Sequence, residues 1–136
     1  MLCCIGSSGD LDAYKHSSAT LKPSADKGIV DRKMAETWAQ MAQGAYGSNP
    51  EFRRDEAIRS ASMAAMALMF AAQARGFSTG PMIGFNPKAL TELLGTGNRY
   101  LPVMTVTLGY ALPNNSPRKV RFPVTVVAGF NLSHSF

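Results

Sequence analysis

Three glycines in residues 76–85, GFSTGPMIGF, are the first candidates for contact with a ligand. Glycine has no side chain, so Gly76, Gly80 and Gly84 offer points where the backbone can approach a flat ligand closely. The N–H groups of such a segment can also donate hydrogen bonds to the heteroatoms of a ring. The pattern favours a rigid floor for a cofactor. A helix C-cap followed by an ordinary connection fits the same composition equally well.

A basic cluster near the C-terminus, Arg118, Lys119 and Arg121, is the second candidate. Arginine and lysine neutralise a phosphate dianion through charge-assisted hydrogen bonds. Together with the glycine segment, the cluster suits a ligand that carries a flat ring at one end and a phosphate at the other. Such a ligand brings its own chemistry, so the protein needs no acid–base pair of its own. The alternative for the basic cluster is a solvated loop.

No catalytic or metal-binding cluster is evident in the sequence. His16 and His134 have no partner in the pattern, and Glu92 is the only carboxylate after Glu56. A histidine-based metal site, a Ser-His-Asp triad and a paired-carboxylate mechanism therefore have little support. We expect no catalytic side chain and no metal, and we expect His16 to be solvated.

The charge distribution is uneven. Residues 1–56 carry seven Lys/Arg and eight Asp/Glu, a net charge of −1, whereas residues 57–136 carry seven Lys/Arg and one acid, a net charge of +6. The second half therefore favours an anionic ligand or partner, although a basic surface that maintains solubility is the alternative. We expect no nucleic-acid binding, because the basic residues are dispersed and few aromatic residues lie among them.

Composition indicates one globular domain over residues 1–136, with 46% hydrophobic and 17% charged residues. The only cysteines, Cys3 and Cys4, are adjacent, so they build no disulfide framework and favour a cytoplasmic, reducing compartment. Palmitoylation of this pair is a weaker alternative. No signal peptide is evident, and the uncharged residues 60–74 are too few to span a bilayer.

In the first third of the chain, residues 2–5 are an apolar run that predicts a buried strand, and residues 6–9 predict a turn. Residues 14–28 are rich in Ser, Lys and Ala and predict an irregular surface connection. From residue 29 to 46, apolar residues at helical spacing predict an amphipathic helix that Gly47 ends. Its apolar face would consist of Val30, Met34, Trp38, Met41 and Ala45.

Asn49-Pro50 begins a longer helix that we expect to run to Arg75. Residues 60–74 are apolar or small on every side, which predicts burial all round, in a core or across a subunit interface. We favour a homodimer interface, because small residues permit close helix approach and methionines pack adaptably.

The rest of the chain holds three further predicted elements. Asn86-Pro87 opens a short helix that ends at Gly95. Alternating apolar and Thr residues predict a strand over residues 101–110, and the valine-rich residues 122–130 are a second β-prone run.

Four segments, in this order, resemble the C-terminal part of the nitroreductase family of FMN-dependent oxidoreductases. They are EAIRSASMAAMALMFAAQARGFSTGPMIGF, NPKALTELLG, RYLPVMTVTLGY and RKVRFPV, and they cover roughly residues 51–127. The N-terminal LCCIGSSGDLDAY resembles the family less specifically. The resemblance implies an α+β fold, in which helices flank an antiparallel or mixed sheet and the long central helix lies at a dimer interface.

The resemblance also implies a cofactor and its contacts. Pro81, Met82, Ile83 and Gly84 match the family loop along the flavin ring, where Ile83 and Gly84 would act through main-chain groups. Lys119 and Arg121 match the family's phosphate-binding basic pair. In the family, NAD(P)H passes hydride to FMN, and a nitro compound, quinone or similar acceptor then takes it up.

The resemblance has one large departure. Family members carry an additional N-terminal segment with an Arg-Arg-Ser-type motif for the flavin phosphate, followed by a Ser/Asn-rich motif near the ring. This sequence begins after both, so we expect an N-terminally truncated nitroreductase-like domain. The alternative function is therefore a non-catalytic remnant or dimerisation module that no longer binds flavin.

Overall fold

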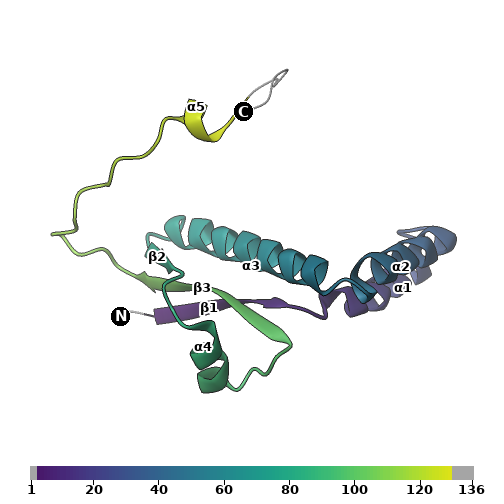
Figure 1. Ribbon diagram of the computed structural model, residues 1–136. Helices are drawn as coiled ribbons and strands as arrows, with labels where there is room; N and C mark the ends of the chain where they lie inside the picture. The colour runs from purple at the N-terminus through teal and green to yellow at the C-terminus, as the bar shows by residue number, and fades with distance from the viewer. Residues whose placement is uncertain (1–2, 130–136) are drawn as a thin grey trace.

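A computed structural model describes residues 3–129 and places one long helix along a three-stranded antiparallel sheet (Figure 1). The elements are β1 (Cys3–Asp10), η1 (Ala13–His16), α1 (Ser17–Asp26), α2 (Arg32–Gly47), α3 (Pro50–Gln73), β2 (Ser78–Met82), α4 (Pro87–Leu94), β3 (Tyr100–Gly109) and α5 (Val124–Val127). This arrangement confirms the α+β class and the antiparallel sheet flanked by helices. None of the helices in residues 3–129 combines the length and the hydropathy that crossing a bilayer requires.

Strand β3 is the centre of the sheet, whose order is β1-β3-β2. Its pairing with β1 runs from Leu108 opposite Cys3 to Tyr100 opposite Asp10, with one irregularity between Ser7 and Ser8 of β1. Its pairing with β2 covers the residues from Gly109 to Thr105. Because β3 is paired on both sides, it sets the register of both neighbours. Its Val106 is 1% exposed, the most buried side chain in the described part of the chain.

Helix α3 packs on the sheet through alanines spaced four residues apart. Ala57, Ala61 and Ala65 are each at most 4% exposed, and Ala72 continues the same face. Small side chains allow the helix backbone to lie close to the strands. At Gly9 of β1 the approach is so close that a Cβ atom would lie 2.3 Å from the carbonyl oxygen of Ala57. Helix and strand can therefore meet here only because Gly9 has no side chain.

Three helices begin with a capping side chain. Asp31 Oδ1 accepts from Met34 N at 3.0 Å, Asn49 Oδ1 from Phe52 N at 3.0 Å, and Asn86 Oδ1 from Ala89 N at 3.2 Å. These bonds satisfy amide groups that have no partner in the first helical turn. The helix starts predicted at Asn49-Pro50 and Asn86-Pro87 are confirmed. At the end of α4, Gly95 adopts φ +62°, a left-handed conformation that favours glycine.

Four local predictions were wrong or incomplete, and in the first three the missing information was a segment elsewhere in the chain that pairs or packs with the predicted one. Residues 6–9 do not turn but continue β1, because β3 satisfies their backbone groups. Residues 14–28 hold η1 and α1, and α1 packs against α2. Half of residues 76–85 is strand β2. The described part of residues 122–130 contains one helical turn, α5, and no strand. Leu2, Phe130 and His134 lie outside the described residues.

The apolar faces of α2 and α3 are only partly buried within one chain. Of the predicted α2 face, Met34, Trp38 and Met41 are 48%, 46% and 65% exposed, and Ala35 is the one buried residue of that helix. The predicted burial of α3 on every side is not observed within one chain, because Met63 and Phe70 are 64% and 65% exposed. The alanine face accounts for all the buried residues of α3.

We predict that Gly9→Ala destabilises the fold strongly, because the new methyl group would overlap the backbone of Ala57. The free energy of unfolding in urea, followed by circular dichroism, should fall by about 1–3 kcal/mol. Gly6→Ala in the same strand is the matched control, since a Cβ there meets nothing within 4 Å. It should change that free energy by less than about 0.5 kcal/mol. Equal effects of the two substitutions would contradict the proposed packing.

Candidate functional site

Residues 81–84 lie at an edge of the sheet, where β2 ends and the chain turns into α4. Met82 is the last residue of β2 paired with β3, so Ile83 and Gly84 lie outside both the strand and the helix. In residues 3–129, no backbone bond outside the helices and strands uses the amide of either residue. Ile83 is 75% exposed, and a Cβ at Gly84 would meet nothing within 4 Å. This edge therefore presents open backbone to a ligand.

The open segment follows a firmly held strand. Thr107 Oγ1 donates to the Gly80 carbonyl at 3.2 Å, and Thr105 Oγ1 donates to the Met82 carbonyl at 3.3 Å. On the other side, Asn86 caps α4. The amides of residues 83 and 84 are thus positioned between two anchored elements before any ligand arrives, which lowers the cost of binding. Neither threonine was predicted from the sequence as a contact of β2, because that role depends on the register of β2 against β3.

The three glycines of this region have three different roles. Gly76 adopts φ +78° just after α3, a conformation that side chains rarely tolerate. Gly80 leaves room for Thr107, whose Oγ1 would lie 2.7 Å from a Cβ there. Gly84 is the one of the three with neither constraint, so its backbone is available to a ligand. The sequence predicted three points of close approach for a ligand, and Gly84 is the one whose lack of a side chain is not explained by the fold itself.

The basic pair lies far along the chain on an exposed segment. Residues 110–123 have no regular secondary structure, and Val120, between Lys119 and Arg121, is 98% exposed. Arg121 Nη1 donates to the Lys119 carbonyl at 3.1 Å, so its side chain folds back on its own backbone. Figure 1 shows this segment leaving the end of β3 and running away from the sheet. Within one chain, the described residues therefore do not bring the basic pair to residues 81–84.

A charged cluster that the sequence did not reveal joins β1, η1 and the start of β3. Arg99 donates twice to the Asp10 carboxylate, from Nε at 2.9 Å and Nη2 at 2.7 Å, and Nη2 also lies 2.7 Å from His16 Nε2. His16 is therefore not a solvated side chain without a partner. The hydrogen bonds from Arg99 hold the pKa of Asp10 below its ordinary value, while partial burial acts in the opposite direction. The same contact raises the pKa of Arg99.

Asp10, His16 and Arg99, which we call the clamp, join the end of β1 to η1 and to the residue before β3. Asp10 also accepts from the Asp12 amide at 2.9 Å, and Leu11 N donates to the Arg99 carbonyl at 3.0 Å. No serine, threonine or cysteine side chain takes part in these contacts. In the described part of the chain, no three side chains among His, Cys, Asp and Glu gather closely enough to hold a metal ion.

Comparison with known proteins identifies the family. The sequence model of the Nitroreductase family matches residues 14–110. The chain belongs to the nitroreductase family. It is 36% identical over 104 residues to YodC of Bacillus subtilis strain 168, a protein named as a candidate NAD(P)H nitroreductase. The match covers 76% of this chain and 51% of YodC, so the chain spans about half the length of that relative.

Two solved structures show the same family fold. The nitroreductase candidate ydfN of Bacillus subtilis superposes with a TM-score of 0.83 at 32% identity, over 90% of this chain and 60% of that one. A nitroreductase candidate of Exiguobacterium sibiricum, solved in complex with FMN, has a TM-score of 0.80 at 25% identity, over 94% and 61% of the two chains. The nitroreductase-like fold expected from the sequence is confirmed, for a chain that spans part of these relatives.

We predict that the clamp makes the stability depend on pH in acid. Because the pKa of Asp10 is lower in the folded chain, its contribution to stability is fully present above the ordinary aspartate range, near pH 4. That contribution is lost as the pH falls through the lowered value. Asp10→Asn should therefore be less stable than wild type at pH 7, and the difference should shrink below about pH 4.

Urea unfolding at a series of pH values tests this prediction. Asp26→Asn is the matched control, since Asp26 pairs with Arg32 at 2.9 Å but its side chain is 49% exposed. The control should stay close to wild type at every pH, because exposed pairs contribute little. A constant gap between wild type and Asp10→Asn from pH 2 to pH 7 would contradict the assignment of the clamp.

Proposed function

We propose that this protein acts as an FMN-dependent oxidoreductase of nitroreductase type, with NAD(P)H as reductant. The acceptors would be nitro compounds, quinones or similar small molecules. When bound, FMN supplies hydride chemistry that no side chain of this protein provides. We also propose a cytoplasmic location, in keeping with adjacent cysteines that form no disulfide framework.

The observation that carries this proposal is the open backbone at residues 83 and 84. Amide N–H groups donate to the nitrogen and oxygen acceptors of a flavin ring, and the absence of a side chain at Gly84 lets the ring lie against the main chain. Pro81, Met82 and the exposed Ile83 would add apolar contacts beside it. The residues present therefore fit the ring end of FMN. A relative of the same fold has been solved with FMN bound.

Lys119 and Arg121 would bind the phosphate of FMN. Both are cations, and neither has an acidic partner among the described residues. To hold one FMN molecule together with residues 81–84, residues 110–123 must fold against the sheet, or two chains must contribute to one site. Charge-assisted bonds from this pair would then fix the phosphate end.

We further propose a homodimer in which the exposed face of α3 is covered. That face includes Met63, Met66 and Phe70, which are 64%, 48% and 65% exposed. The chain exposes 10723 Å² of accessible surface, whereas a compact monomer of this mass exposes about 6,900 Å². Part of the excess belongs to the extended residues 110–123. The exposed apolar side chains of α3 suit its face to contact with a second copy.

A second candidate function is a dimerisation module that does not bind flavin. It is favoured by the position of the basic pair, away from residues 81–84 within one chain. Under this alternative, the α3 face would still associate with a second copy, but the purified protein would have no affinity for FMN. Flavin content and oligomeric state, measured separately, therefore distinguish the two functions.

We predict that the purified protein is yellow, releases FMN on denaturation, and oxidises NADH or NADPH in the presence of a nitroaromatic or quinone. Lys119→Ala and Arg121→Ala should each weaken FMN binding by about 1.5–3 kcal/mol, because each removes a charge-assisted contact. Lys33→Ala, which removes an exposed cation of α2 outside both candidate segments, is the matched control and should change the affinity much less. A colourless protein that neither takes up added FMN nor turns over would overturn the enzymatic function.

We also predict that Phe70→Glu converts a dimer to a monomer, since it places a charge on the proposed interface. Leu93→Glu, at an 81% exposed position on α4, is the control and should leave the dimer intact. Sedimentation velocity measures both variants, and circular dichroism checks that both remain helical. A wild-type protein that is monomeric throughout the micromolar range would refute the interface.

A further inference from the structure

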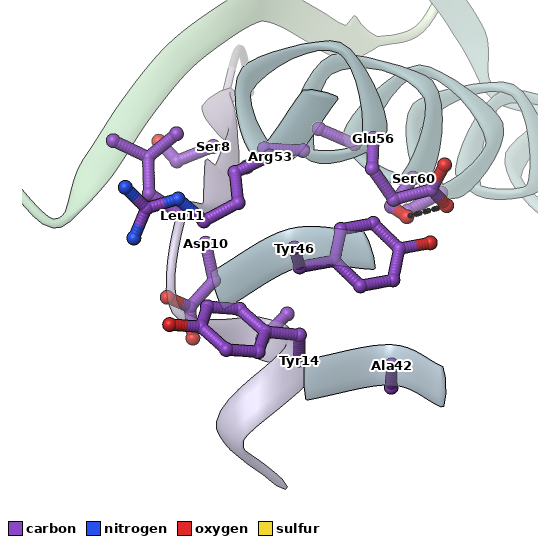
Figure 2. A pocket seen from close by; sticks show the side chains of 14 residues that line it. Ser8, Asp10, Leu11, Tyr14, Ala42, Tyr46, Arg53, Glu56 and Ser60 are labelled. Atoms are coloured by element: carbon purple, nitrogen blue, oxygen red, sulfur yellow. Dashed lines mark hydrogen bonds between the residues drawn. The ribbon is translucent and has the colours of Figure 1, made fainter. Parts of the chain in front are cut away.

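A cavity of about 440 Å³ lies between the end of β1, η1, α2 and the N-terminal half of α3 (Figure 2). Its apolar walls include Ala42, Ala57, Ala61 and Ala64. Arg53 in its wall precedes the last residue of α3 by twenty positions, whereas β2, which leads to residues 83 and 84, begins five positions after that end. At 1.5 Å per residue, the first of these separations is about 30 Å along the helix axis. We call this space the Arg53 cavity.

Aromatic rings form one side of the Arg53 cavity. The rings of Tyr14 and Tyr46 both line it, with centroids 5.9 Å apart and planes inclined by 25°. Tyr46 in turn stacks on Phe52 at 4.9 Å, which fixes its orientation. Figure 2 shows Arg53 reaching from α3 toward Leu11, with the rings of Tyr46 and Tyr14 across from it. A flat apolar group would therefore find preformed aromatic contacts here.

Arg53 is the unusual group in this wall. Among the arginines that the structure describes, Arg53 alone is half-buried, and the others are exposed. Its guanidinium lies 5.8 Å from the centre of the Tyr14 ring, and no carboxylate among residues 3–129 forms an ion pair with it. A cation that has lost part of its hydration and has no counter-ion is costly, so this position favours an anion.

The acids around the cavity are already paired with other cations. Asp10 is bound by Arg99 at 2.7 Å, and Glu56 by Arg59 at 2.9 Å. Asp12 lines an adjoining pocket that Arg53 also lines, and it pairs with Lys15 at 3.0 Å. Each of these three carboxylates therefore has its own cationic partner, and none of them neutralises the charge of Arg53. One uncompensated positive charge suits a monoanion, and the nearby carboxylates disfavour a dianion such as phosphate.

We propose that the Arg53 cavity binds a small aromatic carboxylate, with its carboxylate on Arg53 and its ring beside Tyr14 and Tyr46. The planar guanidinium can donate two parallel hydrogen bonds to a carboxylate. The alanine walls and the tyrosine rings give the apolar body of the ligand a partly enclosed apolar surface to pack against. The volume lies within the range of ordinary small-molecule sites. Binding at this position requires no FMN.

Isothermal titration of the 136-residue chain with sodium 4-hydroxybenzoate tests the proposal. We expect saturable binding of one molecule per chain, and much weaker binding of the neutral 4-hydroxybenzamide. Arg53→Gln should raise the dissociation constant at least about tenfold, because it removes the charge-assisted contact. Arg54→Gln is the matched control: it removes the same charge from the neighbouring exposed position and should change the constant less than about twofold.

Any of three titration results would overturn the proposal: no saturable binding to wild type, equal weakening by the two substitutions, or equal binding of the acid and the amide. Thermal unfolding of both variants checks that Arg53→Gln still folds. Nuclear Overhauser effects between the ring protons of the probe and those of Tyr14 and Tyr46 give an independent test in the wild-type chain. Effects to Met82 and Ile83 instead would place the probe at the sheet edge and refute the assignment.

Discussion

The contact between Gly9 of β1 and Ala57 of α3 is the constraint on which the remaining architecture depends. It brings helix and strand to backbone distance, and the alanines that follow at four-residue spacing extend this contact along the helix. Once that face of α3 is fixed on the sheet, the methionines and Phe70 must face outward. At its far end, α3 stops where Gly76 adopts φ +78°, and β2 begins where its pairing with β3 starts.

Local chemistry was sufficient to predict the helices that carry their own start and stop residues. Asn49-Pro50, Asn86-Pro87 and Gly95 act on the few residues beside them, so their effect is visible in the sequence. The glycines of β1 gave the opposite result. Their turn propensity is real, but pairing with β3, about a hundred residues away, satisfies their backbone groups and overrides it. The valines after Phe122 show the complementary case, since a β-prone run with no strand beside it does not form a strand.

The candidate site was predictable only where it resembles a known pattern. Residues 81–84 were identified from their glycines and from the family resemblance, whereas the threonines that hold β2 required the register of β2 against β3. In the clamp of Asp10, His16 and Arg99, the arginine follows the aspartate by 89 positions and the histidine by 83 positions. At such separations, sequence spacing carries no information about contact. Arg53 was unremarkable in the sequence for the same reason. Its lack of an acidic partner becomes visible only when the pairing of every neighbouring acid is known.

Pro81 in β2 has a consequence for how the sheet can grow. β2 and β1 are the two outer strands of the sheet, and proline has no N–H group to offer to a further strand. The β2 side is therefore a poor template for edge-to-edge polymerisation, whereas β1 has no proline. Aggregation through backbone pairing is directed to one side of the molecule, and a charged or proline substitution on β1 is the rational way to suppress it.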